Sequence, residues 1–161
     1  EISACLVGSE MCIRDRFNRT KLARMKNKEY QKLTACGILF FDVNHLKQVN
    51  DAQGHDMGDT LLKLVANGIR SITSERIHGY RYGGDEFLVV VCDGDELELA
   101  ALIEACNKQM EVLAKQRNIA VTAAVGSAWG QAPLTLNALI RQADQAMYAD
   151  KKQRKRYSDL V

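Results

Sequence analysis

The chain has 161 residues, of which 47% are hydrophobic and 26% are charged, so it suits one compact domain long enough to bury a core. Its net charge of +2 gives no reason to expect nucleic-acid binding, and without a run of about 18 apolar residues we expect no direct membrane contact. Five cysteines without CxxC or zinc-like spacing favour buried thiols in a reducing, cytoplasmic compartment, which is compatible with a membrane-anchored parent protein.

The first sixteen residues differ in character from the rest of the chain. Residues 1–16 have neither a helical nor a strand period, and they lack the basic start of a signal peptide. The stretch Cys5–Asp15 is similar to translated sequencing adapter, so we interpret residues 1–16 as a non-native arm that replaces native sequence. A genuine but unusual N-terminal arm is the alternative. In either case we expect residues 17–161 to form the domain.

Helical and strand patterns alternate along the rest of the chain. In order, the sequence predicts a solvated amphipathic helix at 18–33, a strand at 35–41, helices at 44–50 and 60–72, strands at 77–82 and 87–92, a helix at 96–116, a strand at 119–129 and a helix at 136–152. The strand at 35–41 is continuously apolar, so we expect it to be buried on both faces and to end at Asp42. The segment 54–59 is predicted to be a glycine-punctuated loop in which Asp59 caps the next helix. This order predicts a single α/β domain.

The last predicted helix is amphipathic and continues into a basic tail. We expect it to direct one set of side chains toward the core: Leu139, Ile140, Ala143, Ala146, Met147 and Tyr148.

Acidic residues concentrate in the sequence Gly83-Gly84-Asp85-Glu86, between two predicted strands. The pattern predicts a hairpin whose tight turn uses glycine at positive φ, and the glycines would also let a bulky substrate approach the backbone. If this hairpin lies beside the first strand, Asp42, Asp85 and Glu86 come within a few ångströms of one another, and a cation is needed to neutralise them. Hard oxygen ligands suit Mg²⁺, which also takes phosphate oxygens. A solvated carboxylate is the simpler interpretation of each acid alone, but their joint occurrence favours a metal-dependent nucleotide site.

Three ordered blocks of sequence carry a more specific signal. They are Arg81–Phe87 (RYGGDEF), Phe41–Asp51 followed by Gly54–Asp59 (FDVNHLKQVND and GHDMGD), and Ala143–Lys151 (ADQAMYADK). Together these blocks resemble the GGDEF family of diguanylate cyclases, over residues 17 to 157. The resemblance implies a palm-like, ferredoxin-related nucleotidyl-cyclase fold of the α/β (α+β) class, with a central, mainly antiparallel sheet flanked by helices.

The resemblance also assigns metal-binding and catalytic roles. It implies that Asp42 and Asp85 hold two divalent cations in each active site, Mg²⁺ or alternatively Mn²⁺, with help from the Val43 carbonyl. It further implies that Asp85 and Glu86, the two acids of the turn, are catalytic.

A second set of residues is implied to bind the substrate, GTP. Asn50 and Asp59 correspond to the residues that read the guanine edge, where an amide and a carboxylate match its donors and acceptors. The basic contacts implied by the resemblance are Lys47 and Lys151 on the triphosphate, Lys155 further along the last helix, and Arg81 before the turn. Lys155 stands where arginine is usual and loses its bidentate phosphate geometry.

The implied reaction joins two GTP molecules into cyclic di-GMP and releases two pyrophosphates. Each 3′-hydroxyl attacks the α-phosphate of the opposite GTP, assisted by two metals. Because one domain binds one GTP, catalysis needs a homodimer, and a sensory or receiver domain is expected upstream in the bacterial parent protein. The alternative is a degenerate GTP-binding or partner-assembly module without turnover, against which the intact acids argue.

The sequence departs from the family pattern at three places. Of the usual opening motif only Phe17-Asn18-Arg19 remains, and the lost segment helps to order the nucleotide site, which bears on the activity of this exact chain. Ser74–Ile77 replaces an inhibitory Arg-x-x-Asp site, so product inhibition there is not expected. Asn44 stands in place of a second aspartate and leaves the predicted metal ligands intact.

Overall fold

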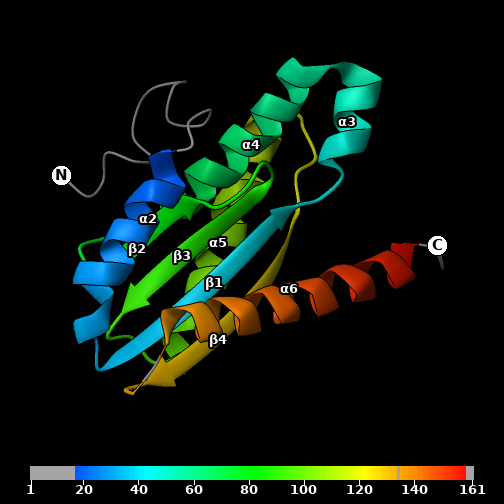
Figure 1. Cartoon of the computed structure of the whole chain (residues 1–161). Helices are drawn as coiled ribbons and strands as arrows, with labels where there is room; N and C mark the ends of the chain where they lie inside the picture. The colour runs from blue at the N-terminus through cyan, green and yellow to red at the C-terminus, as the bar shows by residue number, and fades with distance from the viewer. Residues whose placement is uncertain (1–16, 134, 159–161) are drawn as a thin grey trace.

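The computed structural model of the chain describes residues 17–133 and 135–158 (Figure 1). The arm predicted at residues 1–16 and the side chain of Lys155 lie outside the described residues. Within the described part, no helix is long and apolar enough to cross a membrane.

A four-stranded antiparallel sheet with strand order β2-β3-β1-β4 forms the centre of the fold (Figure 1). Its strands are β1 (Ala35–Val43), β2 (Ile77–Arg81), β3 (Glu86–Cys92) and β4 (Ala123–Gln131). The helical elements are α2 (Phe17–Lys28), the short 3-10 helix η2 (Tyr30–Lys32), α3 (Leu46–Gln53), α4 (His55–Arg70), α5 (Glu96–Arg117) and α6 (Leu136–Ser158). The predicted order of elements and the predicted fold class are both confirmed.

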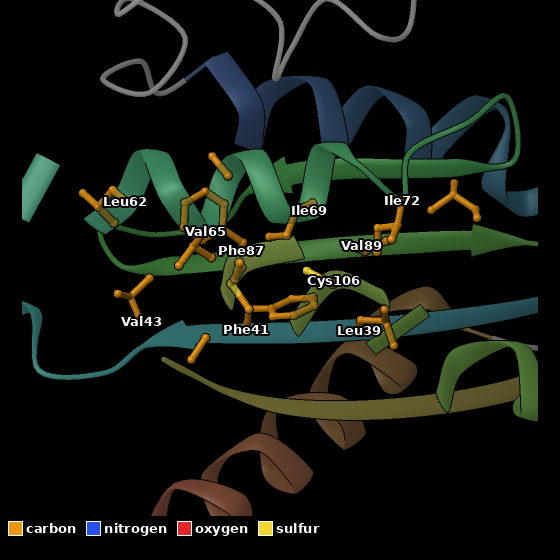
Figure 2. Close-up of a cluster of buried hydrophobic side chains, with 14 of the residues drawn as sticks. Leu39, Phe41, Val43, Leu62, Val65, Ile69, Ile72, Phe87, Val89 and Cys106 are labelled. Carbon is orange, nitrogen blue, oxygen red and sulfur yellow. The ribbon is translucent and has the colours of Figure 1, made fainter. Parts of the chain in front are cut away.

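Two hydrophobic clusters, one on each face of the sheet, make up the core. Because side chains alternate along a strand, Phe41 of β1 packs with α4 and α5, as Figure 2 shows, whereas Phe40 packs with α2 and α6. Residues 36–43 are all buried, which confirms that β1 is covered on both faces. Full burial of one such phenylalanine contributes about 1.5–3 kcal/mol, so this strand anchors the domain and holds its last residues rigidly.

Several predicted boundaries are wrong, each for a local reason. No loop spans 54–59, because Gly54 alone, at φ 88°, turns the chain from α3 into α4. Asp59 therefore lies inside α4 and does not cap it. Strand β4 begins at Ala123, four residues later than predicted.

The last helix also differs from its prediction. Helix α6 extends to Ser158, so the backbone of the basic tail is helical. Leu139, Ile140, Ala143 and Met147 are buried as predicted, but Ala146 is exposed and Tyr148 is 56% exposed. These two residues lie off the buried stripe, which follows the i, i+3 and i+4 spacing of the other four.

Candidate active site

The acidic turn lies directly beside the end of β1. The β1–β3 register places Asp42 opposite Glu86, and the Val43 amide donates to the Asp85 carbonyl at 2.9 Å. Val43 and Asp85 are thus a hydrogen-bonded pair of the antiparallel sheet. Asp42 and Glu86 form a non-hydrogen-bonded pair, the class in which the two side chains lie closer together. The hairpin therefore lies beside the first strand, which was the condition for bringing these acids together.

The turn is closed by Glu86 and braced by Arg81. The amides of Tyr82 and Gly83 both donate to the Glu86 carbonyl, at 2.8 and 3.1 Å. Arg81 Nε and Nη2 donate to the carbonyls of Gly83 and Gly84, at 3.2 and 2.6 Å. Burial lowers the pKa of Arg81, and the nearby carboxylates of Asp59 and Asp85 oppose that shift. Arg81 therefore fixes the shape of the turn from within.

Neither glycine of the turn has the positive φ that the sequence analysis predicted. Steric exclusion explains why glycine stands at position 83, because a Cβ on Gly83 would overlap Oε2 of Glu86. A Cβ on Gly84 would meet no atom within 4 Å. The backbone at Gly84 is therefore open to close approach from outside.

Helix α6 reaches the end of β1 through an ion pair. Lys151 Nζ donates to Asp42 Oδ1 at 2.7 Å, and Asp42 is only 8% exposed. A buried carboxylate needs such a compensating charge. The structure thus brings Lys151, from the third sequence block, to the strand-end acid of the second.

A cavity of about 480 Å³ opens between the start of α3, the acidic turn and α6. Its lining residues are Val43, Asn44, His45, Leu46, Lys47, Gln48, Asp85, Thr122, Lys151 and Arg154. Four of the residues predicted to bind metal or substrate therefore line the same cavity: Val43, Lys47, Asp85 and Lys151. Five other predicted site residues are not among its lining residues: Asp42, Asn50, Asp59, Arg81 and Glu86.

Arg154 lines this cavity and was not singled out from the sequence. Asp150 Oδ2 accepts from Arg154 Nε at 2.8 Å and from the amide of Val125 in β4 at 3.1 Å. One carboxylate oxygen thus ties the guanidinium to an edge strand. The spacing of Arg154 three residues after Lys151 on a helix could have indicated a shared face.

Asn50 presents a polar atom without a partner. Its Oδ1 is buried, and no described residue hydrogen-bonds to it. The amide packs against Gly58, where a Cβ would overlap Oδ1. An unsatisfied buried acceptor costs about 1–3 kcal/mol, which a ligand that donates to it would offset.

The predicted cluster of three carboxylates does not form. Among the described residues, no group of three or more His, Cys, Asp or Glu side chains could hold a metal ion. Asp42 is engaged by Lys151, whereas Asp85 faces the cavity. The remaining candidate ligands are the carboxylates of Asp42 and Asp85 and the carbonyl of Val43. These are hard oxygen donors of the kind that Mg²⁺ prefers, and water and phosphate oxygens would complete its coordination.

Comparison with known proteins identifies the family of this chain. The family described as diguanylate cyclase, GGDEF domain, matches residues 14–157. Diguanylate cyclases DosC and DgcZ of Escherichia coli K12 are 30% and 35% identical over 123 and 120 residues, 74% and 71% of this chain. These matches span only 27% and 40% of the two relatives. The crystal structure of diguanylate cyclase SiaD from Pseudomonas aeruginosa, in complex with its activator SiaC, superposes with TM-score 0.72 at 26% identity, covering 88% of this chain and 58% of that one.

Proposed function

The chain belongs to the GGDEF family of diguanylate cyclases, and we propose that it joins two GTP molecules into cyclic di-GMP with release of two pyrophosphates. The observation that carries this proposal is the cavity where the acidic turn, the end of β1 and two cations of α6 meet. The cavity combines hard-oxygen donors with Lys47, Lys151 and Arg154. Such a combination suits a nucleoside triphosphate bound together with Mg²⁺.

The cationic residues would bind the triphosphate. Lys47 is exposed at the start of α3, and Lys151 and Arg154 approach from α6. The guanidinium of Arg154 can donate to two phosphate oxygens in a forked geometry that lysine lacks. We therefore propose Arg154 as a phosphate contact in addition to Lys155, whose side chain lies outside the described residues.

Asp42, Asp85 and the Val43 carbonyl would hold the divalent cations. Bound metal supplies charge neutralisation of the phosphates and activation of the attacking 3′-hydroxyl. Glu86, opposite Asp42 in the sheet, would act as the second catalytic acid. Asn50 and Asp59 would read guanine, and the unpartnered Oδ1 of Asn50 supports this role because it can accept from the base.

The reaction would take place between two copies of the domain. The proposed contacts would hold one GTP in each domain, so a second copy would present the opposite GTP. Dimerisation therefore raises the rate by bringing the two substrates together. We propose that a sensory or receiver domain in the parent protein controls this approach.

The direct test is cyclic di-GMP formation from GTP and Mg²⁺ by the chain fused to a dimerising coiled coil, with the family's usual opening motif restored before Phe17. We expect product from the fused chain and none from its Asp85→Ala variant. Asp144→Asn, an exposed acid on α6 away from the cavity, is the matched control and should retain activity. GTP binding without product under forced dimerisation would instead identify a binding module that does not turn over.

A further inference from the structure

Cys36 and Cys92 face each other across the sheet, at the opposite end of β1 and β3 from the acidic turn. The register pairs them directly. The next pair is hydrogen-bonded, because the Asp93 amide donates to the Ala35 carbonyl at 3.0 Å. Since the two classes alternate, Cys36 and Cys92 form a non-hydrogen-bonded pair, whose Cα atoms lie about 4.5 Å apart. That separation is within the range of about 4.4–6.8 Å that a disulfide spans.

Both thiols lie on the same face of the sheet. Cys36 is fully buried in the cluster beneath α2 and α6, and the partly buried Cys92 packs against that cluster. Cys106, the third described cysteine, lies in the cluster on the opposite face and so cannot compete for either thiol without unfolding. The sheet therefore presents these two cysteines to each other alone among the described residues.

The two thiols differ in access to solvent. Burial raises the pKa of Cys36 to about 12 and that of Cys92 to about 11, and the nearby Arg76 partly opposes the shift at Cys92. Because the thiolate is the nucleophile, the more accessible Cys92 reacts first, and slowly at neutral pH. Cys92 thus reacts slowly but is accessible to solvent, and the buried Cys36 lies opposite it. This arrangement suits a disulfide that forms under sustained oxidation.

We propose that Cys36 and Cys92 form a reversible intrachain disulfide when the protein meets a small-molecule disulfide such as oxidised glutathione. The Cys92 thiolate attacks one glutathione sulfur, forms a mixed disulfide and releases a glutathione thiolate. Cys36 Sγ then attacks Cys92 Sγ, and its proton passes to the departing glutathione sulfur, which leaves as the second glutathione thiol. Two protein thiols are oxidised to one disulfide, and one glutathione disulfide is reduced to two thiols. Excess reduced glutathione reverses both exchanges, as in transient cytosolic disulfides.

The test is to incubate the whole chain in glutathione buffers of increasing oxidation and to map disulfides by mass spectrometry without reduction. We expect a peptide pair joining Cys36 to Cys92, with a mass lower by two hydrogen atoms. Because the bond closes a long loop in the unfolded chain, the Tm should rise by roughly 10 °C and return on reduction.

Two variants make the result decisive. Cys92→Ser should abolish both the linked peptide and the Tm shift, whereas Cys106→Ser should keep both. The proposal is wrong if Cys92 stops at the glutathione adduct. It is equally wrong if the folded chain keeps both thiols free in fully oxidising buffer, or if Cys36 or Cys92 pairs with Cys5, Cys12 or Cys106 instead.

Discussion

Lys151 Nζ lies 2.7 Å from Asp42 Oδ1, joining the last helix to the end of the first strand across 109 positions of sequence. Asp42 is buried, and Lys151 compensates the burial of its carboxylate. The same lysine lines the cavity beside Asp85. One cation therefore has two roles in this fold, a structural one at the strand end and a proposed one toward the triphosphate.

Removing this lysine should affect both stability and binding. In Lys151→Ala the Asp42 carboxylate stays buried without its partner, which should cost about 1 kcal/mol, since Lys151 is itself 44% exposed. Urea unfolding measures the cost, and GTP titration should show weaker binding. Lys152→Ala, the adjacent exposed lysine over the Tyr148 ring, is the control. Equal losses in the two variants would contradict a specific role for the ion pair.

The proposed metal ligands should be indispensable for turnover. We expect Asp42→Ala and Asp85→Ala each to abolish cyclic di-GMP formation, because each removes one of only two carboxylates in the donor set. Asp59→Ala should chiefly raise the KM for GTP. Initial rates at varied GTP separate the two effects, and wild-type kcat in either metal-ligand variant would refute the assignment.

Gly83→Ala should act through Glu86. The new Cβ would overlap Oε2 of Glu86, the mobile end of a side chain, so the fold should survive while the carboxylate moves. We expect kcat to fall about as far as in Glu86→Gln, with the free energy of unfolding changed by less than about 1 kcal/mol. The double variant should be no slower than Glu86→Gln alone. Additive losses would show that the two substitutions act independently.

Asp150 is expected to be a positioning residue for Arg154. Asp150→Ala frees the guanidinium from β4, so the KM for GTP should rise while kcat stays near wild type. Arg154→Ala should show the same split, and combining the two changes should add little. If Asp150→Ala raised the KM even in the absence of Arg154, its effect would have to come from elsewhere.

The packing of α6 against β4 should not tolerate a side chain at Gly126 of β4. A Cβ there would overlap the Ala143 carbonyl and the Met147 amide, which are helix backbone and cannot rotate away. Gly126→Ala should therefore destabilise the protein by about 2–3 kcal/mol by forcing α6 off the sheet. Gly130→Ala, whose Cβ would meet only the Leu139 side chain at 3.2 Å, should cost less than about 1 kcal/mol. Thermal unfolding of both variants checks the difference.

The local sequence pattern predicted an element correctly where the cause of that element lies within a short stretch of chain. The continuous apolar run at Ala35–Phe41 identified β1. Four of the six residues predicted to face the core from α6 are buried, namely Leu139, Ile140, Ala143 and Met147. Local pattern failed at Gly54, because a single residue at positive φ joins two helices and leaves no loop for a composition signal to mark. It failed at Gly83 because the need for glycine there comes from the Glu86 carboxylate three residues on.

The sequence by itself determined the order of elements, the fold class and the family, since periodicity and motif spacing lie within short stretches of chain. Only the tertiary structure decided that Lys151 meets Asp42, that Asp150 accepts from the Val125 amide of β4, and that Cys36 faces Cys92. Strand register and helix docking create these contacts between residues far apart in the chain. No local spacing encodes them, because each depends on the packing of the whole sheet.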